Sequence, residues 1–174
     1  MHGKVLLQPP LSEISRVVSQ VMFVADAAIS LFSKDEKWAG KIGGYFCLAD
    51  GCSGFPLLIT PIGSNPIEKI ANRIIICQEK AMRLAQHPAH FSSWESRDRS
   101  KDKWGGAVRL LEADLIFSLT GFPELGDEAI MCGATATHNS SVSNPNSLVI
   151  LNEIAQRSNN PYWKPLSQSI GLRK

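Results

Sequence analysis

The chain has 174 residues, of which 44% are hydrophobic and 20% are charged, and its formal net charge is +2. This length suits one domain with its own hydrophobic core, and the composition is typical of a soluble globular protein. A charge so close to zero gives no electrostatic footprint for nucleic acid, and no apolar run approaches the roughly 18 residues that span a membrane. The first residues also lack the pattern of a secretory signal. We therefore expect a cytoplasmic protein without a nucleic-acid or membrane partner.

The first half of the chain predicts a helix, a hairpin and a second helix. Apolar residues recur at helical spacing over 13–32, directly after Ser12, which can cap a helix. The apolar runs 44–49 and 55–60 flank a stretch of turn-forming residues, which is typical of a β-hairpin. A second helix is expected over 66–86, with a capping asparagine and a proline at its start. Both helices are expected to bury their apolar faces.

The second half predicts another hairpin and a third helix, followed by an extension. A long polar loop over 90–103 leads into short apolar runs at 107–111 and 115–119. The third helix is expected over 123–134, because Pro123 suits a first helical position and acidic residues follow it. Beyond a linker-like stretch, residues 147–156 predict a short helix. The remaining tail is expected to be loosely attached, with docking through Tyr162 and Trp163 as the alternative.

Hairpins that alternate with helices are typical of the α+β class. The order predicts an antiparallel sheet of four to five strands covered by three main helices. We expect one α+β domain over residues 1–140 and a C-terminal extension over residues 141–174. The sequence has no βαβ signature and no glycine-rich dinucleotide loop.

A set of short motifs occurs in a recognisable order. The sequence Asp50-Gly51-Cys52-Ser53-Gly54 forms the first hairpin turn, Gly105-Gly106 precedes the second hairpin, and Gly121 is followed by Asp127-Glu128-Ala129. Over about residues 12–135 this order resembles the GlcG/HbpS-like family, also called haem-degrading domains. The resemblance implies profilin- or GAF-like layering and a small-molecule ligand, with haem as one possibility. The loop over 90–103 and the insert Phe122–Leu125 depart from the family pattern.

The loop around the two tryptophans supplies the main candidate site. Trp94 and Trp104 offer flat apolar faces, and Arg97 can grip a carboxylate with two hydrogen bonds. In one interpretation this loop is a lid over a pocket. In the other it is a solvated loop whose charged residues pair with one another, with the tryptophans anchoring it to the core.

We expect a ligand to lie between this loop, the second hairpin and the start of the third helix. Gly105 and Gly106 bring the backbone close, either to a ligand or to meet the geometry of a strand entry. The cationic residues of the loop supply hydrogen-bond donors. The predicted binding residues are Trp94, Arg97, Lys103, Trp104, Gly105, Gly106, Gly121 and Glu124.

The acidic residues after Gly121 have two interpretations. Glu124, Asp127 and Glu128 compensate the positive end of the helix dipole, which disfavours an anion at that position. The alternative is that one of them faces the pocket as an acid or base. No metal site is expected. None of the four histidines lies inside a predicted apolar element, which leaves haem without an obvious axial ligand.

Two classes of function follow from these observations. The first is a small-molecule-binding domain whose ligand is haem or a small carboxylate. The second is a protein-interaction or oligomerisation module, because Trp38, Trp104 and Trp163 look exposed and aromatic residues are enriched at interfaces. On this basis a homo-oligomer is expected. The sequence does not decide whether the protein is an enzyme.

Overall fold

The computed structural model describes residues 11–110, 113–140 and 145–172. Residues 1–10 lie outside these ranges, as do part of the predicted linker and the last residue of the strand expected over 107–111. The described residues form an α+β protein with one four-stranded antiparallel sheet and five α-helices, in agreement with the expected fold class. The elements are α1 (Leu11–Phe32), β1 (Gly43–Asp50), β2 (Pro56–Gly63), α2 (Ile70–Ala85), β3 (Ala107–Leu110), β4 (Leu115–Thr120), α3 (Glu124–Ser140), α4 (Pro145–Ser158) and α5 (Trp163–Ser169). Four short 3₁₀ helices lie between them, η1 (Glu36–Trp38), η2 (Ile67–Lys69), η3 (Ser93–Ser96) and η4 (Arg99–Lys101).

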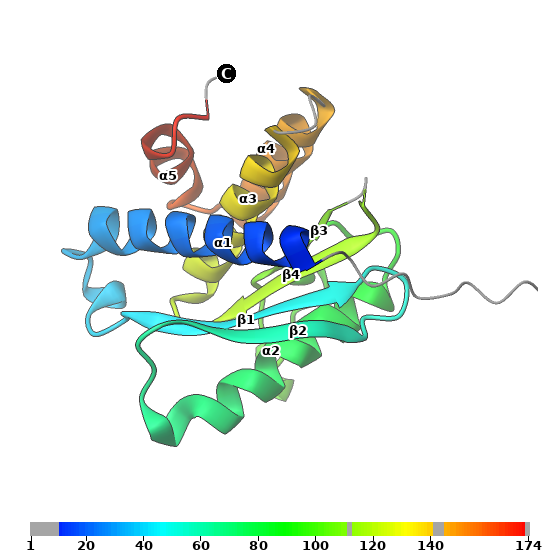
Figure 1. The fold of residues 1–174 in the computed structure, drawn as a ribbon, viewed down its shortest axis with the longest axis horizontal. Coiled ribbons are helices and arrows are strands. Elements are labelled where there is room, and N and C mark those ends of the chain that lie inside the picture. Colours follow the sequence, from blue (N-terminus) through cyan, green and yellow to red (C-terminus); the bar gives the residue numbers. More distant parts are fainter. Residues whose placement is uncertain (1–10, 111–112, 141–144, 173–174) are drawn as a thin grey trace, which may run out of the picture.

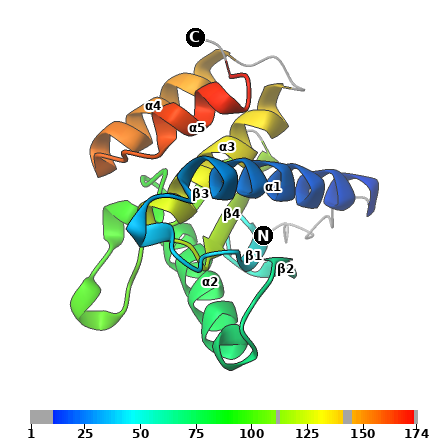
Figure 2. The same ribbon diagram turned by 90° about the vertical axis from the view of Figure 1, so that its left-hand side faces the viewer.

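The sheet has the strand order β2-β1-β4-β3, so the two hairpins meet through β1 and β4. Helix α2 covers one face of the sheet by itself, whereas α1 and α3 cover the other face (Figure 1). Helices α4 and α5 lie side by side beyond α3 and form a further layer on that side (Figure 2). The molecule is therefore thick on the α1 and α3 side and thin on the α2 side.

Strand alternation assigns large and small side chains to opposite faces of the sheet. Phe46, Leu48, Phe117 and Leu119 point into the larger core beneath α1 and α3. The face toward α2 has smaller side chains, and its cluster consists of Cys47, Ala49, Cys77, Ala81, Leu84, Ala85, Ala107 and Ile116. Small residues allow α2 to approach the sheet closely, but they bury little apolar area. Polar side chains fill the rest of the α2 layer.

Helix α1 confirms the expected helix and its buried apolar face. Val17, Val21, Val24, Ala25 and Ala28 are buried, and they belong to the core cluster that also contains α3. Apolar residues also remain exposed on the opposite side of the helix. By length and composition alone, α1 meets the criteria for a membrane span, which core helices and signal sequences also meet.

Helix α2 buries only part of the apolar stripe that was expected to face the core, because Cys77, Ala81 and Ala85 are buried whereas other members are exposed. Ile67 in η2 is 85% exposed, and Ile75 and Met82 of α2 are 63% and 47% exposed. The buried face instead combines Cys77, Ala81, Leu84 and Ala85 with three basic residues, Arg73, Lys80 and Arg83. The expected capping role of Asn65 is also wrong, because its side-chain amide donates to the Gly44 carbonyl at 3.0 Å.

The C-terminal extension is packed against the body of the protein, contrary to the expectation of a loose tail. Leu151, Ile154, Tyr162, Trp163 and Leu166 are buried and belong to the same cluster as α1 and α3. Docking through Tyr162 and Trp163, the alternative considered from the sequence, agrees with the structure.

Glu128 links α3 to both the extension and the loop before β3. Its side chain is fully buried and accepts hydrogen bonds from the side chains of Ser92, Ser158 and Asn160. Burial raises the pKa of Glu128, and the three hydrogen bonds oppose this effect. Because three donors from separate segments converge on one carboxylate, Glu128 is positioned to fix the packing of those segments.

Candidate functional site

A cleft of about 320 Å³ lies between α2, the end of β4 and the start of α3. It is lined by Lys41, Lys69, Asn72, Arg73, Ile76, Lys80, Trp104, Thr120, Gly121, Phe122, Glu124 and Asp127. Since one water occupies about 30 Å³ in the liquid, the cleft has the volume of about ten waters. This volume is at the small end of the range for ligand sites.

One end of the cleft, here called the basic end, is formed by Lys41, Lys69 and Arg73. Arg73 is buried, and its guanidinium donates to the neutral oxygens of Gly43, Asn65 and Gly121. Within the described part of the chain, no carboxylate lies within 4.0 Å of Lys41, Lys69 or Arg73. The basic end therefore has cationic groups whose charge is not neutralised by an ion pair.

The other end, here called the paired end, is built around Lys80 and Asp127. The Lys80 ammonium is buried, and it donates to Asp127 Oδ2 at 3.0 Å and to the Leu119 carbonyl at 2.7 Å. Asp127 Oδ1 accepts from the Phe122 backbone N–H at 3.0 Å. Burial raises the pKa of Asp127 to about 6, while Lys80 acts in the opposite direction. Both carboxylate oxygens are engaged, so Asp127 is held as a structural partner of Lys80.

Gly106 allows the backbone to pass directly beside this buried pair. Its φ is +110°, and an added Cβ would lie 2.6 Å from Asp127 Cβ and 2.9 Å from Lys80 Nζ. Both the conformation and the space therefore require glycine. Gly106 was predicted to allow a close approach of the backbone, and in the structure this approach is made to Lys80 and Asp127.

Glu124 joins the paired end to the tryptophan loop, defined here as residues 91–106. Its Oε1 accepts from the Gly105 backbone N–H at 2.8 Å. Its Oε2 lies 2.9 Å from an Arg99 nitrogen and 3.8 Å from an Arg97 nitrogen. Glu124 is thus neutralised by the loop, and this contact holds the loop at the edge of the cleft.

The structure brings only some of the sequence-predicted residues into the cleft. Trp104, Gly121 and Glu124 line it. Gly105 and Gly106 lie next to it through their contacts with Glu124 and Asp127.

Trp94, Arg97 and Lys103 are not among the residues that line the cleft. The Arg97 guanidinium stacks on Trp94, 3.3 Å from the ring centroid, and Lys103 lines a separate groove beside α2. Arg97 is therefore engaged in contacts within the loop. This agrees better with the interpretation of a solvated loop with internal pairs than with that of a lid over a pocket.

Arg83 anchors the tryptophan loop to α2. Its guanidinium donates to the Ser93 carbonyl at 2.7 Å and the Ser96 hydroxyl at 2.8 Å, and it also reaches the Trp104 carbonyl. Glu79 pairs with its Nε at 2.8 Å. These bonds connect both ends of the loop to one buried side chain.

Replacing Arg83 with glutamine is expected to release this loop. The loss of charge-assisted hydrogen bonds costs about 1.5–3 kcal/mol, and amide exchange over residues 93–106 should accelerate while the sheet stays protected. Hydrogen exchange measures both effects. Arg16→Gln is the control, because Arg16 has only a 3.9 Å exposed contact with Glu13. Equal protection of the loop in both variants would contradict the anchoring role.

Thr120 gives the cleft an unused hydrogen-bonding group. The residue is 9% exposed, and its hydroxyl is buried without a hydrogen-bond partner among the described residues. A buried hydroxyl without a partner is costly in a native structure. Its position in the lining next to the basic end is therefore consistent with a partner supplied from outside the chain.

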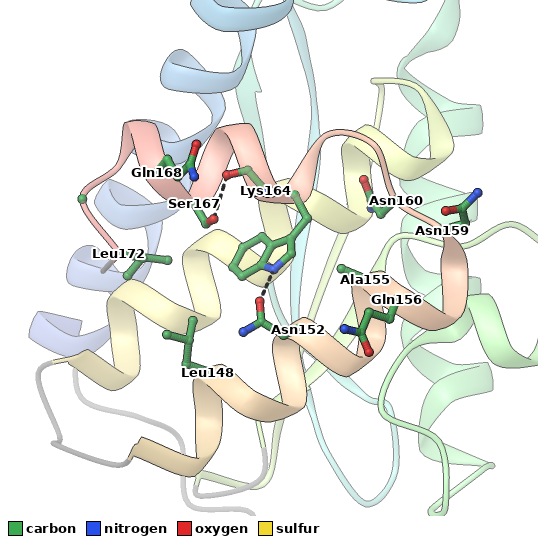
Figure 3. Close-up of a pocket in the computed structure, with 12 residues that line it drawn as sticks. Leu148, Asn152, Ala155, Gln156, Asn159, Asn160, Lys164, Ser167, Gln168 and Leu172 are labelled. Carbon is green, nitrogen blue, oxygen red and sulfur yellow. Dashed lines mark hydrogen bonds between the residues drawn. The ribbon is translucent and has the colours of Figure 1, made fainter. Parts of the chain in front are cut away.

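A second and larger groove, of about 790 Å³, lies between α4 and α5. Figure 3 shows amide side chains among the residues that line it, with Asn152 and Gln156 on α4 and Gln168 on α5. The indole Nε1 of Trp163 donates to Asn152 Oδ1 at 2.7 Å, so the tryptophan is already engaged. Among the described residues, Lys164 is the only charged one in its lining. The groove lacks the convergent charges of the cleft.

The residues of the cleft do not fit haem. The described residues that line it include no histidine, cysteine, methionine or tyrosine to serve as an axial ligand. A volume of about ten waters is also small for a macrocycle. Among the described residues, no group of three or more histidine, cysteine, aspartate or glutamate side chains is arranged to hold a metal ion.

One histidine is not where the sequence indicates. His138 is a buried residue of α3, although its surroundings predict a polar linker. The rings of His87 and His90 stack at 4.9 Å, and His87 Nδ1 lies 2.7 Å from the Arg83 carbonyl. Neither of these two residues lines the cleft.

Comparison with known proteins adds no assignment: the chain matches no protein-family model, no curated protein and no solved structure. The α+β fold with its four-stranded antiparallel sheet is thus established by the structure alone.

Sequence reasoning missed most of the basic residues of the cleft and Thr120. One signal was present, because Lys69, Arg73 and Lys80 follow a spacing of four and seven residues, which aligns them on one face of a helix. Only the apolar face of this helix was considered from the sequence, and its basic face was not. Lys41 and Thr120 carry no signal in the sequence, since only the fold brings them beside α2.

Proposed function

We propose that this protein is a small-molecule-binding domain whose ligand is a small carboxylate, bound in the cleft between α2 and the end of β4. One observation carries the proposal. A buried hydroxyl without a partner, that of Thr120, lines a cleft whose basic end has three cationic groups and no carboxylate. A carboxylate supplies acceptors for such donors and balances their charge.

The proposal favours binding over catalysis. Asp127 has a pKa of about 6, which is in the range useful to an acid or base. Its two oxygens are already engaged with Lys80 and Phe122. Glu128 is buried among its own donors and is not in the lining of the cleft. A binding role also agrees with the resemblance to the GlcG/HbpS-like family, to which we propose that the chain is related.

Thr120→Val separates a binding role from a structural one. The melting temperature should stay unchanged or rise, because the lost hydroxyl has no partner to forfeit. Affinity for a small carboxylate such as benzoate, measured by calorimetry, should fall about tenfold, as one hydrogen bond is worth about 1.5 kcal/mol.

Thr135→Val is the matched control for this experiment. Thr135 is also buried, and its hydroxyl has no partner among the residues that the structure describes, but it lies on α3 and not in the cleft. This variant should bind as the wild type does. If Thr120→Val binds as well as Thr135→Val, the hydroxyl has no role in the site.

The second candidate is an oligomerisation module. The tryptophans that suggested this function do not support it, because Trp38 and Trp163 are buried, at 3% and 4% exposure. A different observation favours it. The apolar residues Ile67, Ile75 and Met82 are exposed on the outer side of η2 and α2 instead.

Light scattering after size-exclusion chromatography tests this second candidate. A homo-oligomer built on α2 should dissociate in Ile75→Asp, because the substitution places a charge in an apolar interface. Val149→Asp on the exposed side of α4 is the control. A wild-type monomer would reject the oligomerisation module and leave the binding domain.

A further inference from the structure

The distribution of free and paired charge along the cleft restricts which ligands it accepts. We infer that the ligand carries one anionic group, held at the basic end, and an uncharged body about the size of a single ring, held toward the paired end. This inference rests on the proposed function and specifies the chemical class of its ligand.

The two ends of the cleft are separated along α2. Lys69 directly precedes the first residue of α2, and Lys80 lies 11 residues further along the chain. At 1.5 Å of rise per residue this corresponds to roughly 16 Å. The end of β4 runs beside the helix in the opposite direction, because Arg73 contacts the Gly121 carbonyl and Lys80, further along the helix, contacts the Leu119 carbonyl. A ligand with two distinct ends therefore meets two different environments.

At the basic end an anionic group is favoured. Lys41 is half-buried and Lys69 is exposed, and Arg73 contributes a buried positive charge that is hydrogen-bonded only to neutral oxygens. An anion at this position gains charge-assisted hydrogen bonds without displacing an internal carboxylate.

At the paired end a second anion finds no available cation. The Lys80 ammonium is held by Asp127 at 3.0 Å, and Arg99 is held by Glu124 at 2.9 Å. A ligand carboxylate here would be desolvated close to Asp127 and Glu124 without gaining a partner, which is unfavourable. Uncharged side chains are available instead, since Ile76, Trp104 and Phe122 line the cleft.

Two probes of nearly the same shape test this inference. Terephthalate has carboxylates at both ends of a benzene ring, whereas 4-carbamoylbenzoate replaces one of them with a neutral amide. Calorimetry on the full chain at pH 7.5 should give at least tenfold tighter binding of 4-carbamoylbenzoate. The double variant Lys41→Gln/Lys69→Gln should lose most of this binding, whereas Lys164→Gln, in the groove between α4 and α5, should retain it.

A second readout locates the uncharged body. Nuclear Overhauser contacts are expected between the ring protons of 4-carbamoylbenzoate and the methyl groups of Ile76. Their absence in the saturated complex would overturn the inference.

The remaining outcomes distinguish the inference from the proposed function. Equal affinity for the two probes, or tighter binding of terephthalate, would overturn the inference and leave a less selective anion site. Binding of acetate without binding of either ring compound would also overturn it, because the body would then be excluded. If none of the three carboxylates binds, the proposed function fails as well.

Discussion

Replacing Lys80 with methionine is expected to lower the free energy of unfolding by about 3–5 kcal/mol at pH 8. The substitution leaves the buried carboxylate of Asp127 without its cation, while methionine retains much of the volume of the lysine stem. The loss should be smaller at pH 5. Without Lys80 the pKa of Asp127 rises further above 6, and the protonated acid is tolerated in a buried site. Urea unfolding at the two pH values measures the difference.

The double variant Lys80→Met/Asp127→Asn is the control for the charge. It removes both ions, so it should recover much of the stability lost at pH 8. A loss that is equal at pH 5 and pH 8, and that the second substitution does not repair, would indicate lost packing and would contradict the electrostatic account.

Asp127 itself should make the stability of the wild type depend on pH. Its pKa is raised from 3.8 to about 6. Between these values the native protein holds a proton that the unfolded chain has released, so the contribution of this group falls as the pH rises through the window. The stability of the wild type minus that of Asp127→Asn should therefore decrease between pH 4 and pH 7. A difference that increases over this range would contradict the raised pKa.

The second large effect is expected at Leu166 in α5. Leu166 is fully buried, and truncating a buried leucine to alanine typically costs about 2–5 kcal/mol. Leu166→Ala should therefore lower the melting temperature of the whole protein in a single transition. Thermal unfolding followed by circular dichroism measures the effect.

Gln168→Ala is the matched control in the same helix, because Gln168 is exposed, and it should change stability by less than about 0.5 kcal/mol. If Leu166→Ala melts as the control does, α5 is an appendage that does not contribute to the core.

The fold class was predictable because its signals are local. Helical spacing identified α1, turn residues between two short apolar runs identified the first hairpin, and two further short apolar runs identified the second. Those hairpins, alternating with helices, were sufficient to predict an antiparallel α+β arrangement. The extent of the elements was less predictable, since the third helix continues to Ser140 instead of ending near residue 134.

The orientation of α2 was not predictable from periodicity. Its sequence has an apolar stripe that includes Ile75 and Met82, and such a stripe normally faces the core. The sheet face beneath α2 includes the small residues Cys47, Ala49 and Ala107. Arg73, Lys80 and Arg83 bury their charged ends against backbone carbonyls on this side. Those carbonyls come from distant segments, so the sequence of α2 does not contain the reason for its orientation.

Only part of the candidate site was predictable from the sequence, because some of its residues come together only through contacts between distant segments. Trp104, Gly121 and Glu124 belong to the segments between which the ligand was expected to lie, and they do line the cleft. Lys41 and Thr120 reach it only because β1 pairs with β4. Arg97 was predicted to grip a ligand, but its contacts are Trp94 and Glu124. A basic residue in a loop is a weak predictor of a free basic group, because loops supply internal partners.

The central claim is that a small carboxylate binds between α2 and the end of β4. A titration of the ¹⁵N-labelled protein with acetate, benzoate and 4-carbamoylbenzoate, followed by ¹H–¹⁵N correlation spectra, tests it most directly. Saturable shifts are expected at the amides of Lys41, Thr120 and Gly121, and these shifts should be lost in Lys41→Gln/Lys69→Gln. Shifts confined to the groove between α4 and α5, or no saturable shift with any of the three compounds, would contradict it.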